Sequence, residues 1–255
     1  MKQLVPWSAG GGGVESLPDG GQRLSIPAGP SGQYRLAQLD DTQNRTRQNF
    51  LWQARCTLEL RARVSAADLP GTWGFGLWND PFTASLGLGG GTRKLPALPD
   101  AAWFFHASAD NWLSLRDNLP ANGFLAATFS SRKVSPLLLA PAVLAAPLLF
   151  WRVTARWIRR LARSWIKEDS TSVNIDPTAW HSYQLDWRAN SVIFQVDGQT
   201  VLESLTAPRG QLGLVIWIDN QYAAFTPEGR LAYGTQANPQ PAWLEIEGLR
   251  IAPGN

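Results

Sequence analysis

The sequence predicts an all-β protein, a sandwich of two antiparallel sheets with one helical insertion at about residues 134–168. Two observations predict this class. From about residue 50, short apolar or alternating segments of strand length follow one another, with Gly, Asn, Asp and Pro between them. Only the segment 134–168 departs from this pattern. We expect residues 1–255 to form a single domain, because all-β domains of this length are ordinary.

The expected strands of the first half follow a loop rich in Gly, Ser and Pro at residues 8–32. Within that loop, RLSIPA alternates and predicts a first strand. WQARCTLELRARVS alternates polar and apolar residues, and GTWGFGLWNDPF is an aromatic strand that ends at the turn signal Asn-Asp-Pro. AAWFFHAS and NGFLAATFS are apolar runs and predict two short buried strands.

The second half of the chain predicts five further strands. HSYQLDWRANSVIFQVDGQTVLES contains three of them, with turns at Arg-Ala-Asn-Ser and at Asp-Gly, a preferred hairpin pair. GQLGLVIWID and AWLEIEGLRIA complete the series. Strands at this spacing indicate an antiparallel sandwich.

The composition excludes several classes of function. A net charge of +3 is too small for a nucleic-acid-binding polycation, so we expect no nucleic-acid partner. The one cysteine, Cys56, excludes an internal disulfide framework. Paired His and Cys spacing and dense acidic loops are absent from the sequence, so we expect no metal and no cofactor. No apolar stretch follows the first residues as in a secretory signal, which favours a cytoplasmic protein, peripheral at the membrane if the insertion binds lipid.

The insertion has two parts. Residues 137–151 are apolar but hold Pro141 and Pro147, and they are shorter than the ~20 residues of a spanning helix. The following residues have a helical period that places six apolar side chains on one face: Val153, Trp157, Ile158, Leu161, Trp165 and Ile166. Six basic residues cover the rest of the surface: Arg152, Arg156, Arg159, Arg160, Arg163 and Lys167.

A cationic helix with Trp on its apolar face is typical of an interfacial membrane helix, so residues 137–167 predict contact with an anionic membrane surface. The alternatives are a lid or oligomer surface, and a helix that packs its apolar face on the sandwich. The residues assigned to a membrane or lid role are Trp151, Trp157, Arg159, Arg160 and Trp165.

Three segments resemble a known enzyme family, the family 16 glycoside hydrolases. They are FLWQARCTLELRA…GTWGFGLWND, AWHSYQLDWRANSVIFQVDGQTV and AWLEIEGLRI, which together cover about residues 50–130 and 177–252. The second is the most specific, with a His-Xaa-Tyr pattern at His181 and Tyr183, then Asp186, Trp187 and a closing Val-Asp-Gly. The resemblance implies a concanavalin A-like jelly roll whose concave sheet forms a sugar groove, and it implies a structural role for His181.

The family's catalysis uses a Glu-Xaa-Asp-Xaa-(Xaa)-Glu strand after the aromatic strand, because hydrolysis needs two carboxylates aimed at the glycosidic bond. The strand at that place here is PDAAWFFHAS, in which alternate residues share a face. Three sets of residues could face the groove: Ala102, Phe104 and His106; Asp100, Ala102 and Phe104; or Ala101, Trp103 and Phe105. No set supplies two carboxylates, so we expect an apolar groove that stacks a sugar ring or holds a nonpolar ligand.

Thirteen tryptophans exceed what a core alone requires, and several are expected to line this groove. The residues assigned to ligand binding are Trp73, Trp78, Trp103, Phe104, His106, Trp112, Trp217, Asp219, Asn220 and Tyr222. Some of these residues have a structural role as the alternative, since Asp219-Asn220, and Asn79-Asp80-Pro81 directly after Trp78, are also sequences favoured in turns.

These observations leave three hypotheses open. The first is a non-hydrolytic protein that binds a small-molecule, glycan or lipid-like ligand in the groove and touches a membrane with its helix. The second is a divergent glycosidase or other enzyme that uses His106 with a nearby acid, Asp100 or Asp110, since imidazole titrates near neutral pH. The third makes residues 134–168 a lid or an oligomer surface.

Overall fold

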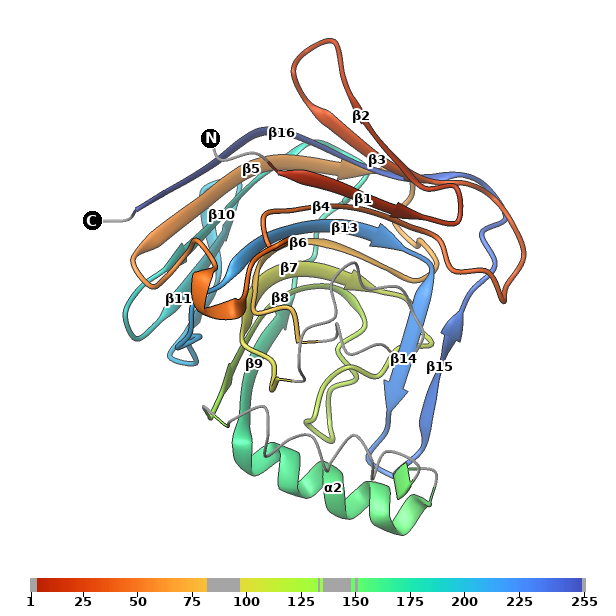
Figure 1. The fold of residues 1–255 in the computed structure, drawn as a ribbon, viewed down its shortest axis with the longest axis vertical. Coiled ribbons are helices and arrows are strands. Elements are labelled where there is room, and N and C mark those ends of the chain that lie inside the picture. Colours follow the sequence, from red (N-terminus) through yellow and green to blue (C-terminus); the bar gives the residue numbers. More distant parts are fainter. Residues whose placement is uncertain (1–3, 82–96, 133, 135–147, 150, 254–255) are drawn as a thin grey trace.

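The computed structural model describes residues 4–81, 97–132, 134, 148–149 and 151–253. Two seven-stranded antiparallel sheets pack face to face as a jelly-roll sandwich (Figure 1). The first sheet, here called the concave sheet, curves around the space above the helix and has the order β1 (Val5–Ala9), β4 (Leu36–Asp40), β13 (Gly213–Asp219), β6 (Thr72–Trp78), β7 (Ala101–Ala107), β8 (Gly123–Ser131) and β9 (Ile166–Ser172).

The second sheet, here called the outer sheet, has the order β12 (Gln199–Ser204), β11 (Val192–Val196), β10 (His181–Trp187), β5 (Cys56–Val64), β16 (Ala242–Pro253), β3 (Gln22–Ile26) and β2 (Gly13–Ser16). A separate hairpin is formed by β14 (Gln221–Phe225) and β15 (Leu231–Thr235). The helical elements of the described residues are the 3-10 turn η1 (Arg47–Asn49) and the helix α2 (Arg152–Trp165).

The core fills the space between the two sheets because alternate residues of each strand point inward. On β5 these are the apolar side chains of every second residue from Cys56 to Val64. At the centre, the Phe104 ring packs against rings from both sheets, with centroids 5.7 Å from Phe75, 5.1 Å from Tyr183 and 5.2 Å from Phe194. This aromatic cluster joins the concave sheet to the outer sheet.

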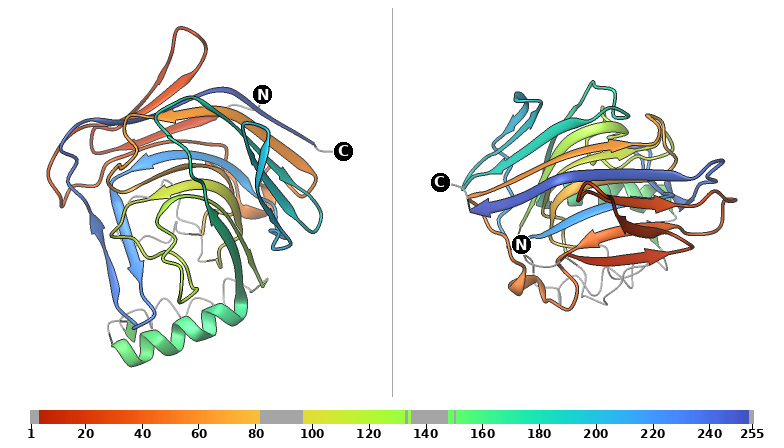
Figure 2. Two further views of the ribbon diagram at one scale, coloured as in Figure 1. Left: turned by 180° about the vertical axis from the view of Figure 1, so that it is seen from behind. Right: turned by 90° about the horizontal axis from the view of Figure 1, so that it is seen from above.

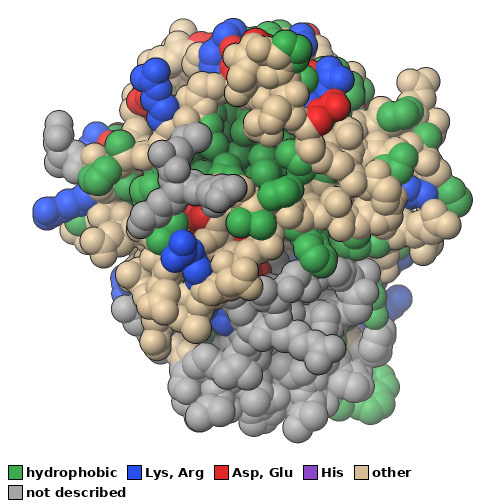
Figure 3. Space-filling view, turned by 45° about the horizontal axis from the view of Figure 1, so that its top comes forward, with side chains coloured by type: hydrophobic (Ala, Val, Ile, Leu, Met, Phe, Trp, Pro, Cys, Tyr) green, Lys and Arg blue, Asp and Glu red, His purple; other side chains and the backbone are tan. Residues whose placement is uncertain are grey.

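The hairpin and the helix lie on the concave side of the molecule. The hairpin β14–β15 descends from the end of β13, and α2 runs from near the hairpin tip to the start of β9 (Figures 1 and 2). No helix among the described residues is long and apolar enough to cross a bilayer. On the face drawn in Figure 3, hydrophobic side chains gather in a hollow with charged side chains near its rim.

The all-β sandwich with a helix between two strands is confirmed, and so are the expected strands from residue 50 onward. The strands β1, β2, β4 and β9 and the hairpin β14–β15 were not predicted from the sequence. The helical period was extended too far, because the helix ends at Trp165 and residues from Ile166 pair with β8 as a strand. The apolar residues 135–147 of the insertion lie outside the described residues.

Candidate functional site

The strand β7 crosses the middle of the concave sheet, and its register decides what that sheet presents. Ala102 and Phe104 belong to the core cluster between the sheets. Trp103 and Phe105 therefore point to the opposite, concave face, where Phe105 belongs to a second, smaller apolar cluster and Trp103 packs against it. Of the three sets of β7 residues that could face the groove, the structure therefore shows Ala101, Trp103 and Phe105.

This register corrects three of the expected ligand-binding residues. Trp73 and Phe104 lie in the core, each 1% exposed, and His106 is 4% exposed. The imidazole of His106 stacks on Trp73, with centroids 5.7 Å apart and an interplanar angle of 11°. Phe104 and His106 were misassigned because β7 is apolar on both faces, so alternation could not distinguish them. Trp73 was misassigned because β6 also carries large aromatic residues on both faces, Trp73 in the core and Trp78 on the concave side.

His106 also lies far from Asp100, one of its two expected acidic partners. Asp100 stands just before β7 and His106 is six residues further along the extended chain, ~20 Å away. Asp100 is itself engaged, since its Oδ1 accepts a hydrogen bond from the Ser131 amide at 2.8 Å. The structure does not bring the two candidate catalytic residues together.

Burial lowers the pKa of His106 to about 4, although Asp68 opposes the shift. Between this value and the ordinary pKa of about 6.5, the unfolded chain binds a proton that the folded protein does not. Stability contributed by neutral His106 is therefore present above pH 6.5 and is lost as the pH falls toward 4.

We expect His106→Phe to remove this pH dependence. Urea unfolding from pH 4 to pH 8 is expected to show a wild-type stability that falls relative to the variant by up to ~3 kcal/mol on acidification. Contributions from groups that both proteins share cancel in the difference. Parallel stability curves across this range would contradict a buried, neutral His106.

The concave face carries a group of aromatic side chains around Trp103. Its ring centroid is 5.5 Å from that of Trp217, 6.3 Å from Trp78, 6.1 Å from Phe129 and 5.6 Å from Phe105. These rings come from β13, β6, β8 and β7, which are neighbours in the sheet. We call Trp78, Trp103, Phe105, Phe129 and Trp217 the aromatic patch.

Two glycines of β6 make room for the aromatic patch. Gly76 pairs with Trp103 and Gly74 pairs with Phe105. A Cβ built on Gly76 would lie 2.5 Å from the Cα and Cβ atoms of Trp103, and one on Gly74 would lie 2.9 Å from those of Phe105. Side chains on β6 at these positions would therefore collide with β7, and the glycines allow the large rings to lie across the sheet.

Several indole N–H groups near this patch lack an acceptor. Those of Trp78 and Trp103 are buried and donate to no atom of the described residues, and the same holds for Trp112 and for Trp7. Trp7 pairs with Gln38, which pairs with Trp217, so its side chain shares the concave face. The Trp217 indole differs, because it donates to Thr72 Oγ1 at 2.9 Å. Trp73 and Trp187 show the same lack of an acceptor in the core.

Three carboxylates point to the concave face among the described residues of its strands: Asp40, Asp219 and Glu168. Asp40 pairs with Val215, which precedes Asp219 by four residues, so the two carboxylates are ~13 Å apart along the strand. Glu168 lies four strands away from β13, roughly 15–20 Å across the curved sheet. No two of these three carboxylates converge.

Asp219 carries a buried carboxyl on this face. Burial raises its pKa to about 7, and hydrogen bonds from the Thr72 hydroxyl at 2.9 Å and the Gln221 amide at 3.1 Å oppose the shift. The Thr72 hydroxyl thus donates to Asp219 and accepts from Trp217. This places one carboxyl that titrates near neutral pH beside the aromatic patch.

The neighbouring residues assigned by sequence have different roles. Asn220 is fully buried, and its side chain accepts from the Arg35 amide and donates to the carbonyls of Gln33 and Gln236. It therefore holds three chain segments together. Tyr222 lies on the hairpin strand β14, where its ring covers Gly234.

A loop of the chain itself covers part of the concave face. Leu113 and Ala121 of the segment 108–122 pack against Phe105 and Leu125. Trp112 in the same loop pairs with the hairpin, since its amide donates to the Ala223 carbonyl at 2.9 Å and its carbonyl accepts from the Phe225 amide at 3.0 Å.

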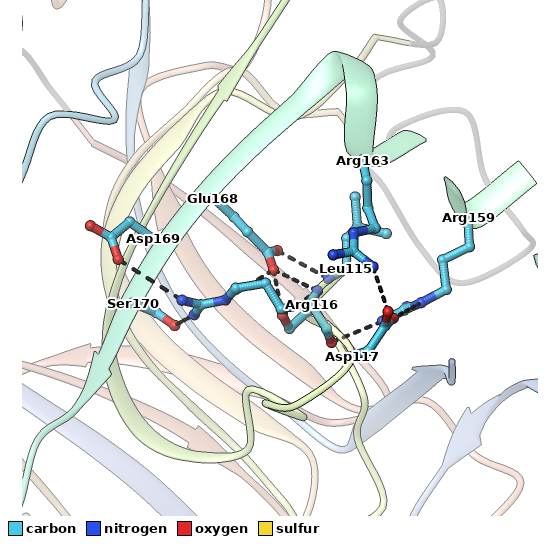
Figure 4. Close-up of polar contacts among 9 residues, drawn as sticks. Leu115, Arg116, Asp117, Arg159, Arg163, Glu168, Asp169 and Ser170 are labelled. Carbon is cyan, nitrogen blue, oxygen red and sulfur yellow. Dashed lines mark hydrogen bonds and ion pairs between the residues drawn. The ribbon is translucent and has the colours of Figure 1, made fainter. Parts of the chain in front are cut away.

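Glu168 of β9 fixes this loop in place (Figure 4). Its carboxylate accepts hydrogen bonds from the Ser114 hydroxyl, the Leu115 amide at 3.1 Å and the Arg116 amide at 2.9 Å. The Arg116 guanidinium forms an ion pair with it at 3.3 Å. The Glu168 side chain is only 7% exposed, so its charge is stabilised by these donors rather than by water. No role for Glu168 was predicted from the sequence, because its hydrogen-bond donors come from a loop that has no recognisable pattern.

A second hollow lies at one end of the sandwich, with a volume of about 1190 Å³. Its lining includes Asp100, the start of β9 at Lys167 and the loop 205–211. The cations around it are Arg47, Arg132, Lys167 and Arg209. Arg47 donates to the Asn79 and Asp80 carbonyls at 2.7 and 2.6 Å, so at least this cation supports the loop structure.

No protein-family model matches the sequence, and no curated protein matches it either. This chain is similar in fold to solved glucanases. The β-glucanase of Bacillus licheniformis has a TM-score of 0.49 at 13% identity, over 99% of this chain and 93% of that one. A family 16 endo-glucanase from Bacteroides ovatus has a TM-score of 0.49 at 10% identity, over 98% and 95%. A pseudo β-1,3-glucanase of Mycobacterium tuberculosis has a TM-score of 0.46 at 12% identity, over 93% and 76%.

Proposed function

We propose that this protein binds a glycan on its concave sheet without hydrolysing it. The observation that carries the proposal is the position of Trp103, at the middle of the concave face. Its ring belongs to the aromatic patch, and its indole N–H has no acceptor among the described residues. A ligand that offers both an apolar ring face and oxygen acceptors matches these two properties.

The choice of a glycan over a lipid-like ligand rests on the indole donors. The N–H groups of Trp78 and Trp103 are already buried without an acceptor in the free protein, so a nonpolar ligand would gain nothing from them, whereas an oxygen that reaches them would recover ~1–3 kcal/mol each. Sugar hydroxyl oxygens accept such hydrogen bonds while the C–H face of the ring stacks on the indole. A lipid-like ligand is therefore the weaker alternative.

The proposal of binding without cleavage rests on the separation of the acids. Glycoside hydrolysis with two carboxylates needs them roughly 5–9.5 Å apart. Asp40 and Asp219 are ~13 Å apart by strand register, and Asp40 also accepts hydrogen bonds from Thr42 and Gln38. Asp219 could donate a proton at neutral pH, but the described residues of the concave strands place no second carboxylate opposite it.

The test is calorimetric titration of the purified protein with β-glucan and chitin oligosaccharides. We expect at least one oligosaccharide class to bind, and Trp103→Ala to weaken that binding by at least about tenfold, since ring stacking contributes ~0.5–1.5 kcal/mol beyond the apolar area that the ligand buries. Trp180→Ala is the matched control, because Trp180 packs under Arg61 and Arg63 on the outer sheet. Equal affinities of wild type and Trp103→Ala would exclude the aromatic patch as the site.

The same samples test the enzymatic alternative. Oligosaccharides recovered after long incubation are expected to be intact by mass spectrometry. Cleavage that disappears in Asp219→Asn would overturn the non-hydrolytic proposal and would assign the acid role to Asp219, whose pKa is raised to about 7 by burial.

A further inference from the structure

The helix α2 turns a row of apolar side chains toward solvent. Val153, Trp157 and Leu161 follow one another at intervals of four residues and are 71%, 63% and 39% exposed. Trp151, directly before the helix, is 65% exposed. Large apolar side chains gathered in this way are uncommon on a monomer surface and mark an interaction surface.

The same helix presents cations beside the apolar row. Arg152, Arg156 and Arg160 are exposed, and no ion pair joins them to any residue that the structure describes. The sequence from 152 to 167 contains no Asp or Glu. We call Trp151, Val153, Trp157 and Leu161, with these three arginines, the outward face of α2.

The opposite side of the helix holds it to the protein. Ala155 is fully buried and Arg159 is 2% exposed. The Arg159 guanidinium donates to the Arg116 carbonyl at 3.0 Å and pairs with Asp117 at 3.5 Å (Figure 4). It also donates to the Phe225 carbonyl. Arg163 pairs with the same aspartate. Polar contacts thus attach the helix to the sandwich, and its largest exposed apolar side chains take no part in this attachment.

This arrangement corrects part of the sequence-based assignment. Arg159 was assigned to the membrane or lid surface, but it is the buried attachment of the helix. Trp165 and Ile158 are half-buried, so they do not belong to the exposed row. The helical period placed the apolar residues correctly relative to one another but could not show which of them the sandwich would cover.

We propose that the outward face of α2 binds the surface of an anionic lipid bilayer. Tryptophan is favoured at the boundary between headgroups and acyl chains, and flanking arginines reach the phosphates. Unpaired cations beside an apolar row match a bilayer surface, in which anionic headgroups lie over the apolar acyl chains. A second copy of the chain fits less well, because a twofold contact would bring two sets of the same arginines together. This inference is independent of the proposed glycan site.

The test is flotation of the full chain with vesicles of phosphatidylcholine and phosphatidylglycerol at about 2 to 1, and with phosphatidylcholine alone. We expect binding to the anionic vesicles that weakens as the ionic strength rises. Arg156→Gln with Arg160→Gln is expected to weaken binding about 30-fold, which corresponds to about 1 kcal/mol per arginine. Trp157→Ser with Leu161→Ser is expected to weaken it at least about tenfold.

The control variant is Leu205→Ser, which removes an 87% exposed leucine outside the helix. It is expected to float like wild type, and far-ultraviolet circular dichroism should show that all variants are folded. Absence of flotation by wild type at low salt, or equal flotation of wild type and both double variants, would overturn the proposal. Light scattering that shows a dimer lost in Trp157→Ser, without vesicle binding, would assign the face to self-association instead.

Discussion

Phe104→Ala is expected to lower the free energy of unfolding by about 3–5 kcal/mol, among the largest effects of any single substitution in this chain. The ring is 1% exposed and packs between the two sheets against Phe75, Tyr183 and Phe194. Alanine would leave a cavity, and the surrounding rings, which are fixed on three other strands, cannot move far enough to fill it. Equilibrium unfolding in urea, followed by circular dichroism, measures the loss.

Trp103→Ala is the matched control for this prediction, since Trp103 precedes Phe104 on β7 and points the other way. Trp103 is half-buried on the concave face, so we expect a smaller loss, ~1–2 kcal/mol, even though its side chain is larger. A greater loss of unfolding free energy for Trp103→Ala than for Phe104→Ala would contradict the observed register of β7, because it would indicate that Trp103 and not Phe104 faces the core.

Glu168→Ala is expected to destabilise the protein by about 3–5 kcal/mol, because it removes one partner of a buried charge network. The substitution leaves the Leu115 and Arg116 amides without their acceptor and the Arg116 guanidinium without its nearest carboxylate. The segment 108–122 should also loosen from the concave sheet. Urea unfolding measures the first effect, and faster hydrogen exchange of the Leu115 and Arg116 amides measures the second.

Asp169→Ala provides the comparison for Glu168→Ala. Asp169 is the next residue, is 37% exposed and approaches the same arginine only to 3.9 Å. Its removal is expected to cost less than about 1 kcal/mol, as for most surface ion pairs. Similar losses in the two variants would show that Glu168 does not fix the loop in the way described.

The strands of the outer sheet could be predicted because each alternates cleanly. On β5, β10 and β11 the residues that face the core are apolar, and those that face solvent are mostly polar, such as Glu59, Gln184 and Gln195. Alternation of this kind fixes both the strand and its face. The Asp197-Gly198 turn, with positive φ at both residues, likewise follows from its sequence.

The concave sheet could be predicted only in part, since β7 is apolar on both faces and alternation carries no information there. The second face is apolar because it supports the aromatic patch and the loop 108–122. Edge strand β9, with the sequence IKEDSTS, was missed because its polar residues serve loop contacts that are distant in sequence. The partners of Glu168 and Arg159 are tertiary, so no local pattern could predict them.

The central claim is that the concave face presents Trp103 where hydrolysis would need converging carboxylates. The most direct test is a crystal structure of the protein with the tightest-binding oligosaccharide from the titration panel. We predict an intact ligand, with one sugar ring stacked on the Trp103 indole and a sugar oxygen accepting its N–H. A ligand bound elsewhere, or a cleaved product held between two carboxylates on this face, would contradict the account.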